Sequence, residues 1–257
     1  MKNLLAGFLL LLTSCATMRP TSETGFLNRT VDHAGRTYRY VVYVPDSDRT
    51  RMLPVVLFLH GAGERGDDGL RQTAVGLGSA IRWSPERFPM IVVMPQAPAE
   101  TQWLADSATA AMIALDAATR EFRGDPSRTY LTGLSLGGYG TWHLAMAHPG
   151  RFAALVPVCG GILKPETAES VRQSPLTAGA ADPYAVTAER VRAVPAWIFH
   201  GAEDKTIPPS ESRRMYAELQ KLGADVRYTE FPGVGHNAWD PAYGNAELWT
   251  WLLAQRR

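Results

Sequence analysis

Short runs of apolar residues recur along this chain and constrain its fold more than any other feature. Five of them are continuous, and each is followed within two residues by Gly, Pro or His. Such runs are typical of strands that are buried on both faces of a parallel sheet. A sixth segment, residues 37–44, alternates and is rich in Tyr and Val, and residues 226–231 form a seventh candidate. The five continuous runs are residues 55–59, 91–94, 129–132, 154–158 and 196–199.

Helical patterns lie between these strands. Ser107 is a candidate cap for a helix to about residue 122, and residues 136–147 and 246–253 also have helical patterns. A further helix over 211–222 would end at Gly223. Strands that alternate with helices predict an α/β fold, with a doubly wound, mostly parallel sheet in a single domain. In such sheets the chemistry lies at the carboxyl ends of the strands.

Composition excludes several classes of protein. The chain has 257 residues, 26 Lys and Arg against 25 Asp and Glu, and 46% hydrophobic residues. With a formal charge of +1, the chain lacks the excess of positive charge that is typical of nucleic-acid-binding proteins. Its apolar content is too high for a disordered chain. Two cysteines can form neither a multi-bridge scaffold nor a four-cysteine zinc site. We therefore expect one globular domain over residues 24–257.

The first 14 residues have the pattern of an export signal, with Lys2 before an apolar run that is too short to span a bilayer. This run ends in Leu-Thr-Ser-Cys at residues 12–15, which resembles a bacterial lipobox and predicts lipid attachment at Cys15. Cleavage after Ala16 is the alternative, and would remove Cys15. Residues 15–23 are polar and suit a tether. The resulting prediction is an exported protein, anchored to a membrane only through this lipid.

One strand end carries a candidate nucleophile. Residues 133–137 read Gly-Leu-Ser-Leu-Gly, with a predicted strand before them and a predicted helix after them. A serine on a sharp strand-to-helix turn needs small neighbours, because larger side chains would clash there. The following helix places its free N–H groups beside the serine oxygen. Ser135 is therefore the predicted nucleophile, and an incidental serine in a Gly-rich turn is the alternative.

A serine hydroxyl needs a base, and six histidines are candidates. In the chain order that accompanies this motif, the base follows the serine, which excludes His33 and His60. His143 and His148 lie in or at the end of the helix after Ser135, and His200 leads directly into a glycine. His236 remains, in a loop with small neighbours between the last strand and the last helix, and is the predicted base.

The acid that orients the base should lie at a strand end between Ser135 and His236. Glu203 and Asp204 both follow the strand at 196–199, and the residues alone do not choose between them. Asp182 precedes Pro183 and more naturally begins a turn.

A second strand end predicts an oxyanion hole. Residues 60–63 read His-Gly-Ala-Gly, whose small side chains allow the backbone to approach a substrate. Backbone N–H groups around a developing oxyanion stabilise it. We expect these donors to be Ala62 and the residue after the nucleophile, Leu136. His60 is expected to orient the loop. The charged residues 64–69 are expected to form a solvated loop, and a loop that reaches the substrate is the alternative.

Four segments in this order resemble the α/β-hydrolase superfamily: residues 60–66, 133–142, 199–205 and 233–239. Within it, the chain is most similar to single-domain carboxylesterases related to dienelactone hydrolases and to the phospholipase/carboxylesterase group, especially the subset labelled predicted peptidases. The resemblance implies a serine esterase that uses neither a metal nor an organic cofactor. It also implies that Asp204, and not Glu203, is the acid.

One segment departs from the family pattern. Residues 162–193 are longer than the usual connection, and we expect them either to cover the active site or to form a surface excursion. Trp103 and Trp239 lie in loops near the predicted site and would either line it or belong to the core.

These features together predict a serine carboxylesterase that acts on a small-molecule or polysaccharide-linked ester. An acetyl or feruloyl carbohydrate esterase and a peptidase are alternatives within enzymes. A binding protein with the fold but without the reaction is the alternative outside them. Cys159, at the end of a buried strand, is expected to be an unpaired core thiol.

Overall fold

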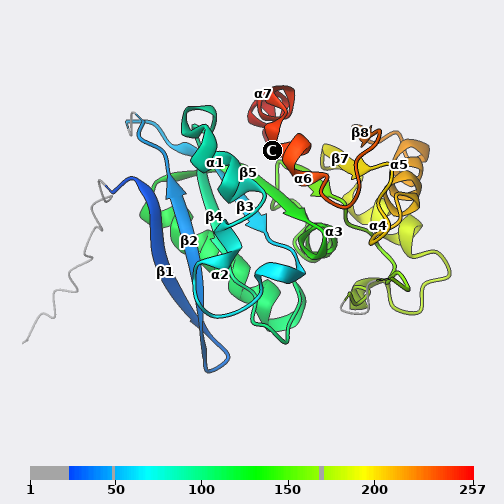
Figure 1. The fold of residues 1–257 in the computed structure, drawn as a ribbon, viewed down its shortest axis with the longest axis horizontal. Helices are drawn as coiled ribbons and strands as arrows, with labels where there is room; N and C mark the ends of the chain where they lie inside the picture. The colour runs from blue at the N-terminus through cyan, green and yellow to red at the C-terminus, as the bar shows by residue number, and fades with distance from the viewer. Residues whose placement is uncertain (1–22, 48–49, 168–170) are drawn as a thin grey trace, which may run out of the picture.

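A computed structural model describes residues 23–47, 50–167 and 171–257, and the predicted export signal and Cys15 lie outside these residues. The described chain forms an eight-stranded sheet in the order β1-β2-β4-β3-β5-β6-β7-β8. The pairs β1–β2 and β2–β4 are antiparallel, and the other pairs are parallel. Figure 1 shows the sheet running from β1 and β2 to β7 and β8, which lie beside α4 and α5. The predicted α/β fold is confirmed.

All seven predicted strands are present, with ends that differ by a few residues. The strand β1 was not predicted, because it lies at the sheet edge and its partly exposed side chains include several polar ones. It turns into β2 through Ala34 and Gly35, both at positive φ, which suits a tight hairpin. The strands are β1 (Gly25–His33), β2 (Arg36–Val44), β3 (Leu53–Leu59), β4 (Ile91–Pro95), β5 (Gly124–Leu134), β6 (Ala154–Val158), β7 (Ala196–Gly201) and β8 (Val226–Phe231).

The four predicted helices are present as α2, α3, α5 and α7. Ser107 does not cap α2, which begins two residues earlier, and the side chain of Ser107 is buried within it. Gly223 follows α5 at φ +67°, as a helix stop requires. Three short helices, α1, α4 and α6, were not predicted. The helices are α1 (Leu77–Trp83), α2 (Ala105–Glu121), α3 (Leu136–Ala147), α4 (Pro183–Val191), α5 (Ser210–Lys221), α6 (Trp239–Gly244) and α7 (Ala246–Ala254).

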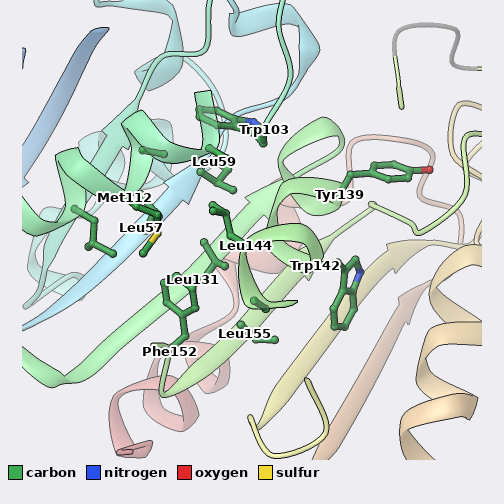
Figure 2. Packing of buried hydrophobic residues seen from close by; sticks show 14 of the residues in the cluster. Leu57, Leu59, Trp103, Met112, Leu131, Tyr139, Trp142, Leu144, Phe152 and Leu155 are labelled. Atoms are coloured by element: carbon green, nitrogen blue, oxygen red, sulfur yellow. The ribbon is translucent and has the colours of Figure 1, made fainter. Parts of the chain in front are cut away.

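Both faces of the sheet are covered, and successive residues of the inner strands enter different cores. Leu57 and Leu59 of β3 pack on the side of α2, α3, α4 and α5, whereas Val56 and Phe58 pack on the side of α1, α6 and α7. Figure 2 shows the first core, where Leu57 and Leu59 meet Leu144 of α3. Burial on both faces explains why these strands are continuously apolar.

The segment at 162–193 is partly helical. Its described residues include the short 3-10 helix Pro175–Thr177 and α4, which packs between α3 and α5. Asp182 is the N-cap of α4, and its side chain accepts hydrogen bonds from the N–H groups of Tyr184 and Ala185. The segment is therefore built into the domain. Among the described helices, none has the length and apolarity that a membrane crossing needs.

Candidate active site

Ser135 sits where β5 ends and α3 begins. Its backbone has φ +53° and ψ −116°, a conformation that costs free energy for any residue with a side chain. The Ser135 N–H donates to the Val158 carbonyl at 2.9 Å, which ties the turn to the end of β6. The predicted sharp strand-to-helix turn is therefore present, and it directs the side chain away from the sheet.

The two glycines of the motif are required by close backbone approach. A Cβ on Gly133 would lie 2.3 Å from the Gly137 carbonyl oxygen, and a Cβ on Gly137 would lie 1.9 Å from the Leu59 carbonyl oxygen. Real Cβ atoms do not come this close, so a larger residue would displace β3 or α3. The pattern read from the sequence thus has a steric cause.

The structure brings Ser135, His236 and Asp204 together. His236 Nε2 lies 2.9 Å from Ser135 Oγ, and His236 Nδ1 lies 2.7 Å from Asp204 Oδ2. The serine follows β5, the aspartate follows β7 and the histidine follows β8, so all three come from the carboxyl ends of strands. In this chain of hydrogen bonds the carboxylate accepts Nδ1–H and leaves Nε2 free to accept the serine proton.

The side chain of Asp204 is also held by residues other than His236. Its Oδ1 accepts hydrogen bonds from the N–H groups of Thr206 and Ile207, at 2.8 and 2.9 Å. His200 Nε2 lies 3.3 Å from Oδ2. Burial alone would raise the pKa of Asp204, but the hydrogen bonds from His200, His236 and Ile207 outweigh it and hold that pKa well below its usual value. The carboxylate therefore stays ionised at neutral pH, whereas the rival Glu203 is exposed.

His200 was set aside as a base, and sequence reasoning missed that it supports the acid. It is fully buried at the end of β7, where Nδ1 lies 2.7 Å from Ser212 Oγ. Its Nε2 lies 2.9 Å from the Ile207 carbonyl and donates to it. The only available signal was that His200 lies four residues before Asp204, at the end of the strand that leads to it.

The remaining histidines lie apart from this chain of hydrogen bonds. His143 Nδ1 is 2.8 Å from Ser174 Oγ, and burial lowers the pKa of His143 to about 4. Burial likewise lowers the pKa of His148. His33 contacts Asp106 at 3.0 Å near the molecular surface.

The loop after β3 begins with His60, whose role agrees with the sequence prediction. Burial lowers the pKa of His60 to about 4, so the ring is neutral. Its Nδ1 donates to the Gly61 carbonyl at 2.6 Å, and its Nε2 accepts from the Ala97 N–H at 3.0 Å. The ring therefore fixes the entry to this loop.

Ala62 and Leu136 both lie at the pocket that contains Ser135. Ala62 is the first residue of the 3-10 helix Ala62–Glu64, and Leu136 is the first residue of α3. The first N–H groups of a helix have no acceptor within that helix. Both residues therefore combine a first-turn N–H with a place in the pocket wall, and they stay the candidates for the predicted oxyanion hole.

The pocket at Ser135 is mostly apolar. Trp239 lines it, with its ring centroid 5.5 Å from that of His236. Trp103 does not line it: this residue is 2% exposed, donates from Nε1 to the His60 carbonyl at 2.9 Å, and borders a narrow neighbouring cavity. The other residues that line the pocket with Ser135 are Gly61, Ala62, Gly63, Glu64, Leu134, Leu136, Val171, Thr206, Ile207 and His236.

Two residues at the site were not predicted. Val171, from the long connection 162–193, is 3% exposed and closes part of the pocket. Glu64 also lines the pocket, so at this position the charged loop reaches the site, which was the alternative to a solvated loop, although the sequence singled out no individual residue of it. Burial raises the pKa of Glu64. Neither residue type carries a signal in the sequence that would have distinguished it.

Cys159 is the unpaired, buried thiol that was expected. It adopts φ +40°, and its sulfur lies within 4.8 Å of ligand atoms of Asp204 and His236. Burial raises the pKa of Cys159, so it is a neutral thiol. The sequence placed it at a strand end but not beside the histidine and aspartate.

The fold and the arrangement of Ser135, His236 and Asp204 are those of the α/β-hydrolase superfamily, as the sequence predicts. A model of the prolyl oligopeptidase family matches residues 99–254, a range that includes Ser135, Asp204 and His236. The chain belongs to the prolyl oligopeptidase family.

Two solved structures resemble this chain. A thermostable esterase is 32% identical, with a TM-score of 0.76 over 90% of this chain and 63% of its own. An S-formylglutathione hydrolase (FrmB) from Staphylococcus aureus is 17% identical, with a TM-score of 0.70 over 90% of this chain and all of its own, and it shows the shared fold.

An uncharacterized secreted protein from Arthroderma benhamiae is 26% identical over 74% of this chain. The chain spans 22% of the length of that relative and 63% of the length of the thermostable esterase.

Proposed function

We propose that this protein is a serine carboxylesterase with Ser135 as nucleophile, His236 as base and Asp204 as the acid that orients the base. One observation carries the proposal: the hydrogen-bonded chain from Asp204 through His236 to Ser135 ends in an open, mostly apolar pocket. The 32% identity to a thermostable esterase supports ester substrates.

The first half-reaction forms an acyl-enzyme. Ser135 Oγ attacks the ester carbonyl carbon while its proton moves to His236 Nε2, and the carbonyl π electrons become an oxyanion. The Ala62 and Leu136 N–H groups donate to this oxyanion, and each such donor is worth about 2.7–4 kcal/mol at the transition state. Asp204 stabilises the imidazolium. Collapse of the intermediate breaks the bond to the leaving oxygen, which takes the proton from His236 as the alcohol departs.

The second half-reaction restores the enzyme. His236 Nε2 accepts a proton from water, the hydroxide oxygen attacks the acyl carbon, and the same two N–H groups hold the second oxyanion. When this intermediate collapses, the bond to Ser135 Oγ breaks, and His236 returns the proton to the serine. The carboxylic acid leaves. Every step uses residues of this chain and water.

A fluorophosphonate probe and p-nitrophenyl acetate test the proposal together. The wild-type protein should be labelled on Ser135 and should release p-nitrophenol, whereas Ser135→Ala should do neither. The matched control is Ser79→Ala, a serine on α1 away from the pocket, which should behave like the wild type. Failure of the wild-type protein to react with the probe or with any ester would support a binding protein that retains only the fold.

Three substrate classes follow from the proposal. Short acyl or aryl esters fit a pocket of this kind. Acetylated or feruloylated polysaccharide suits an exported esterase, and a ferulic acid esterase shares the fold at 16% identity and a TM-score of 0.68. Peptides are the third class, because a model named for prolyl oligopeptidases matches the chain. A panel of p-nitrophenyl esters of rising chain length, methyl ferulate, acetylated xylan and a peptide p-nitroanilide would separate them.

We also propose that the protein is exported and lipid-anchored at Cys15, with residues 15–23 as a tether to the domain at 24–257. The apolar run before Cys15 and the secreted Arthroderma relative support export. Labelling with radioactive palmitate tests the anchor: the wild-type chain should incorporate label and Cys15→Ser should not. An unlabelled wild-type chain would instead favour cleavage after Ala16.

A further inference from the structure

Glu64 brings a carboxyl group into the pocket. Among the residues that the structure describes, it forms no ion pair. The adjacent cation, Arg65, is directed elsewhere: its Nε donates to the Ala62 carbonyl at 2.9 Å, and its Nη1 to the Thr101 carbonyl at 3.3 Å. A half-buried carboxylate without a counter-charge is costly, and it attracts a cation that enters the same space.

This carboxylate lies beside the nucleophile. The position that a Cβ on Gly61 would occupy is 3.0 Å from Glu64 Oε2 and 3.6 Å from Ser135 Cβ. The two side chains therefore flank the same glycine. The Glu64 backbone is also held, since Gln96 Nε2 donates to its carbonyl at 3.1 Å. These two distances place Glu64 Oε2 within about 7 Å of Ser135 Cβ, so a substrate bound at Ser135 lies near the carboxyl group.

Among the described residues that line the pocket, His236 is the only other side chain that can carry a charge. Apolar side chains and glycines form most of the wall, and Thr206 is the remaining polar neighbour. In such surroundings a single carboxylate is poorly screened, and its attraction for a cation is stronger than it would be at the protein surface.

From this arrangement we propose that Glu64 gives the site a preference for esters that carry a cationic ammonium group close to the scissile carbonyl. This inference rests on the proposed esterase function. It names the substrate class: aminoacyl-like esters if the cation lies on the acyl side, and amino-alcohol esters if it lies on the alcohol side.

Two pairs of isosteric esters separate charge from shape. On the alcohol side, acetylcholine is compared with 3,3-dimethylbutyl acetate, in which carbon replaces the quaternary nitrogen. On the acyl side, glycine betaine methyl ester is compared with methyl 3,3-dimethylbutanoate. For each pair, the ratio of kcat/KM for the cationic ester to that for the neutral ester is measured in the wild type and in Glu64→Gln. Intrinsic reactivity cancels when the two ratios are compared.

The ratio should fall about tenfold in Glu64→Gln for at least one pair, which corresponds to about 1.4 kcal/mol of lost attraction. The matched control is Asp67→Asn, which removes the same charge from an exposed position on the same loop and should leave both ratios unchanged. If Glu64→Gln does not fold, Glu64→Met is the second variant.

An unchanged ratio for both pairs in a folded, active Glu64 variant would overturn the inference and leave the esterase proposal intact. An equal fall in Asp67→Asn would also overturn it, since the effect would then come from the general field of the loop. A wild-type protein that hydrolyses none of the four esters, and is not labelled on Ser135, would instead count against the proposed function itself.

Discussion

His200 Nε2 lies 3.3 Å from Asp204 Oδ2, the same oxygen that is 2.7 Å from His236 Nδ1. The aspartate is thus held between two histidines, one of which is fully buried and the other open to the pocket. With Thr206 and Ile207 on its other oxygen, the carboxylate has one orientation available. That orientation selects the tautomer of His236 that can accept a proton from Ser135.

Replacing this carboxylate should therefore disable the proposed reaction. We expect Asp204→Asn to lower kcat for p-nitrophenyl acetate about 10⁴-fold, because an amide neither holds the required tautomer nor stabilises the imidazolium. The neighbouring Glu203→Gln is the matched control and should retain wild-type kinetics, since that side chain is exposed. The opposite pattern would make Glu203 the acid.

The lowered pKa of Asp204 also predicts how its contribution to stability varies with pH. A carboxyl group whose pKa is lower in the folded state than its unfolded value of about 3.9 stabilises the fold above that value. The contribution is lost as pH falls from about 4 towards the folded pKa. The difference in unfolding free energy between wild type and Asp204→Asn should be constant between about pH 7 and 5 and should shrink below about pH 4. Urea titrations at each pH would measure it, and a difference that grows on acidification would contradict the prediction.

A second buried carboxylate, Glu211, anchors the start of the long connection. Its Oε2 accepts from the N–H groups of Ile162 and Leu163, at 2.7 and 3.1 Å, and its Oε1 accepts from Tyr184 Oη at 2.5 Å. We expect Glu211→Ala to lower the free energy of unfolding by about 3 kcal/mol, because three donors lose a charged acceptor. Tyr184→Phe removes one of the three bonds and should cost about 1 kcal/mol.

Denaturant unfolding followed by circular dichroism gives both values. The exposed Glu189→Ala on the neighbouring α4 provides a control, with little effect expected. Equal losses for Glu211→Ala and Glu189→Ala would show that the hydrogen bonds to Glu211 contribute no net stability.

The sequence was most informative where backbone geometry depends on residue type. Apolar runs predicted the buried strands, because a strand covered on both faces tolerates few polar residues. The glycines at 133 and 137 predicted the turn at Ser135, since the close approach of Gly133 to Gly137 and of Gly137 to Leu59 leaves no space for a Cβ. Chain order then excluded two of the six histidines, and the predicted helix and strand positions set aside three more, which left His236, 2.9 Å from Ser135 Oγ.

The sequence was least informative where distant segments meet. Edge strand β1 lacks an apolar run because its side chains are only partly buried. His200, Glu64 and Val171 reach the site through tertiary packing, and no local pattern separates them from similar residues elsewhere. The short helices α4 and α6 are stabilised by packing against their neighbours, so their own sequences give weak signals.

Val171 brings the long connection to the wall of the pocket at Ser135. Deleting most of residues 165–183 would test the role of this segment poorly, because it would also remove Asp182, whose side chain caps α4. Val171 itself is 3% exposed and lines the pocket with Ser135, so a single substitution changes the pocket and leaves the helix intact.

We expect Val171→Ala to raise the ratio of kcat/KM for p-nitrophenyl octanoate to kcat/KM for p-nitrophenyl acetate. Val171→Phe should lower this ratio about tenfold, because one or two methylene groups in an apolar pocket give discrimination of that size. Lys164→Ala, exposed on the same segment, should keep the wild-type ratio. If neither Val171 variant changes the ratio, the acyl chain must lie on another wall, where Trp239 is the largest side chain.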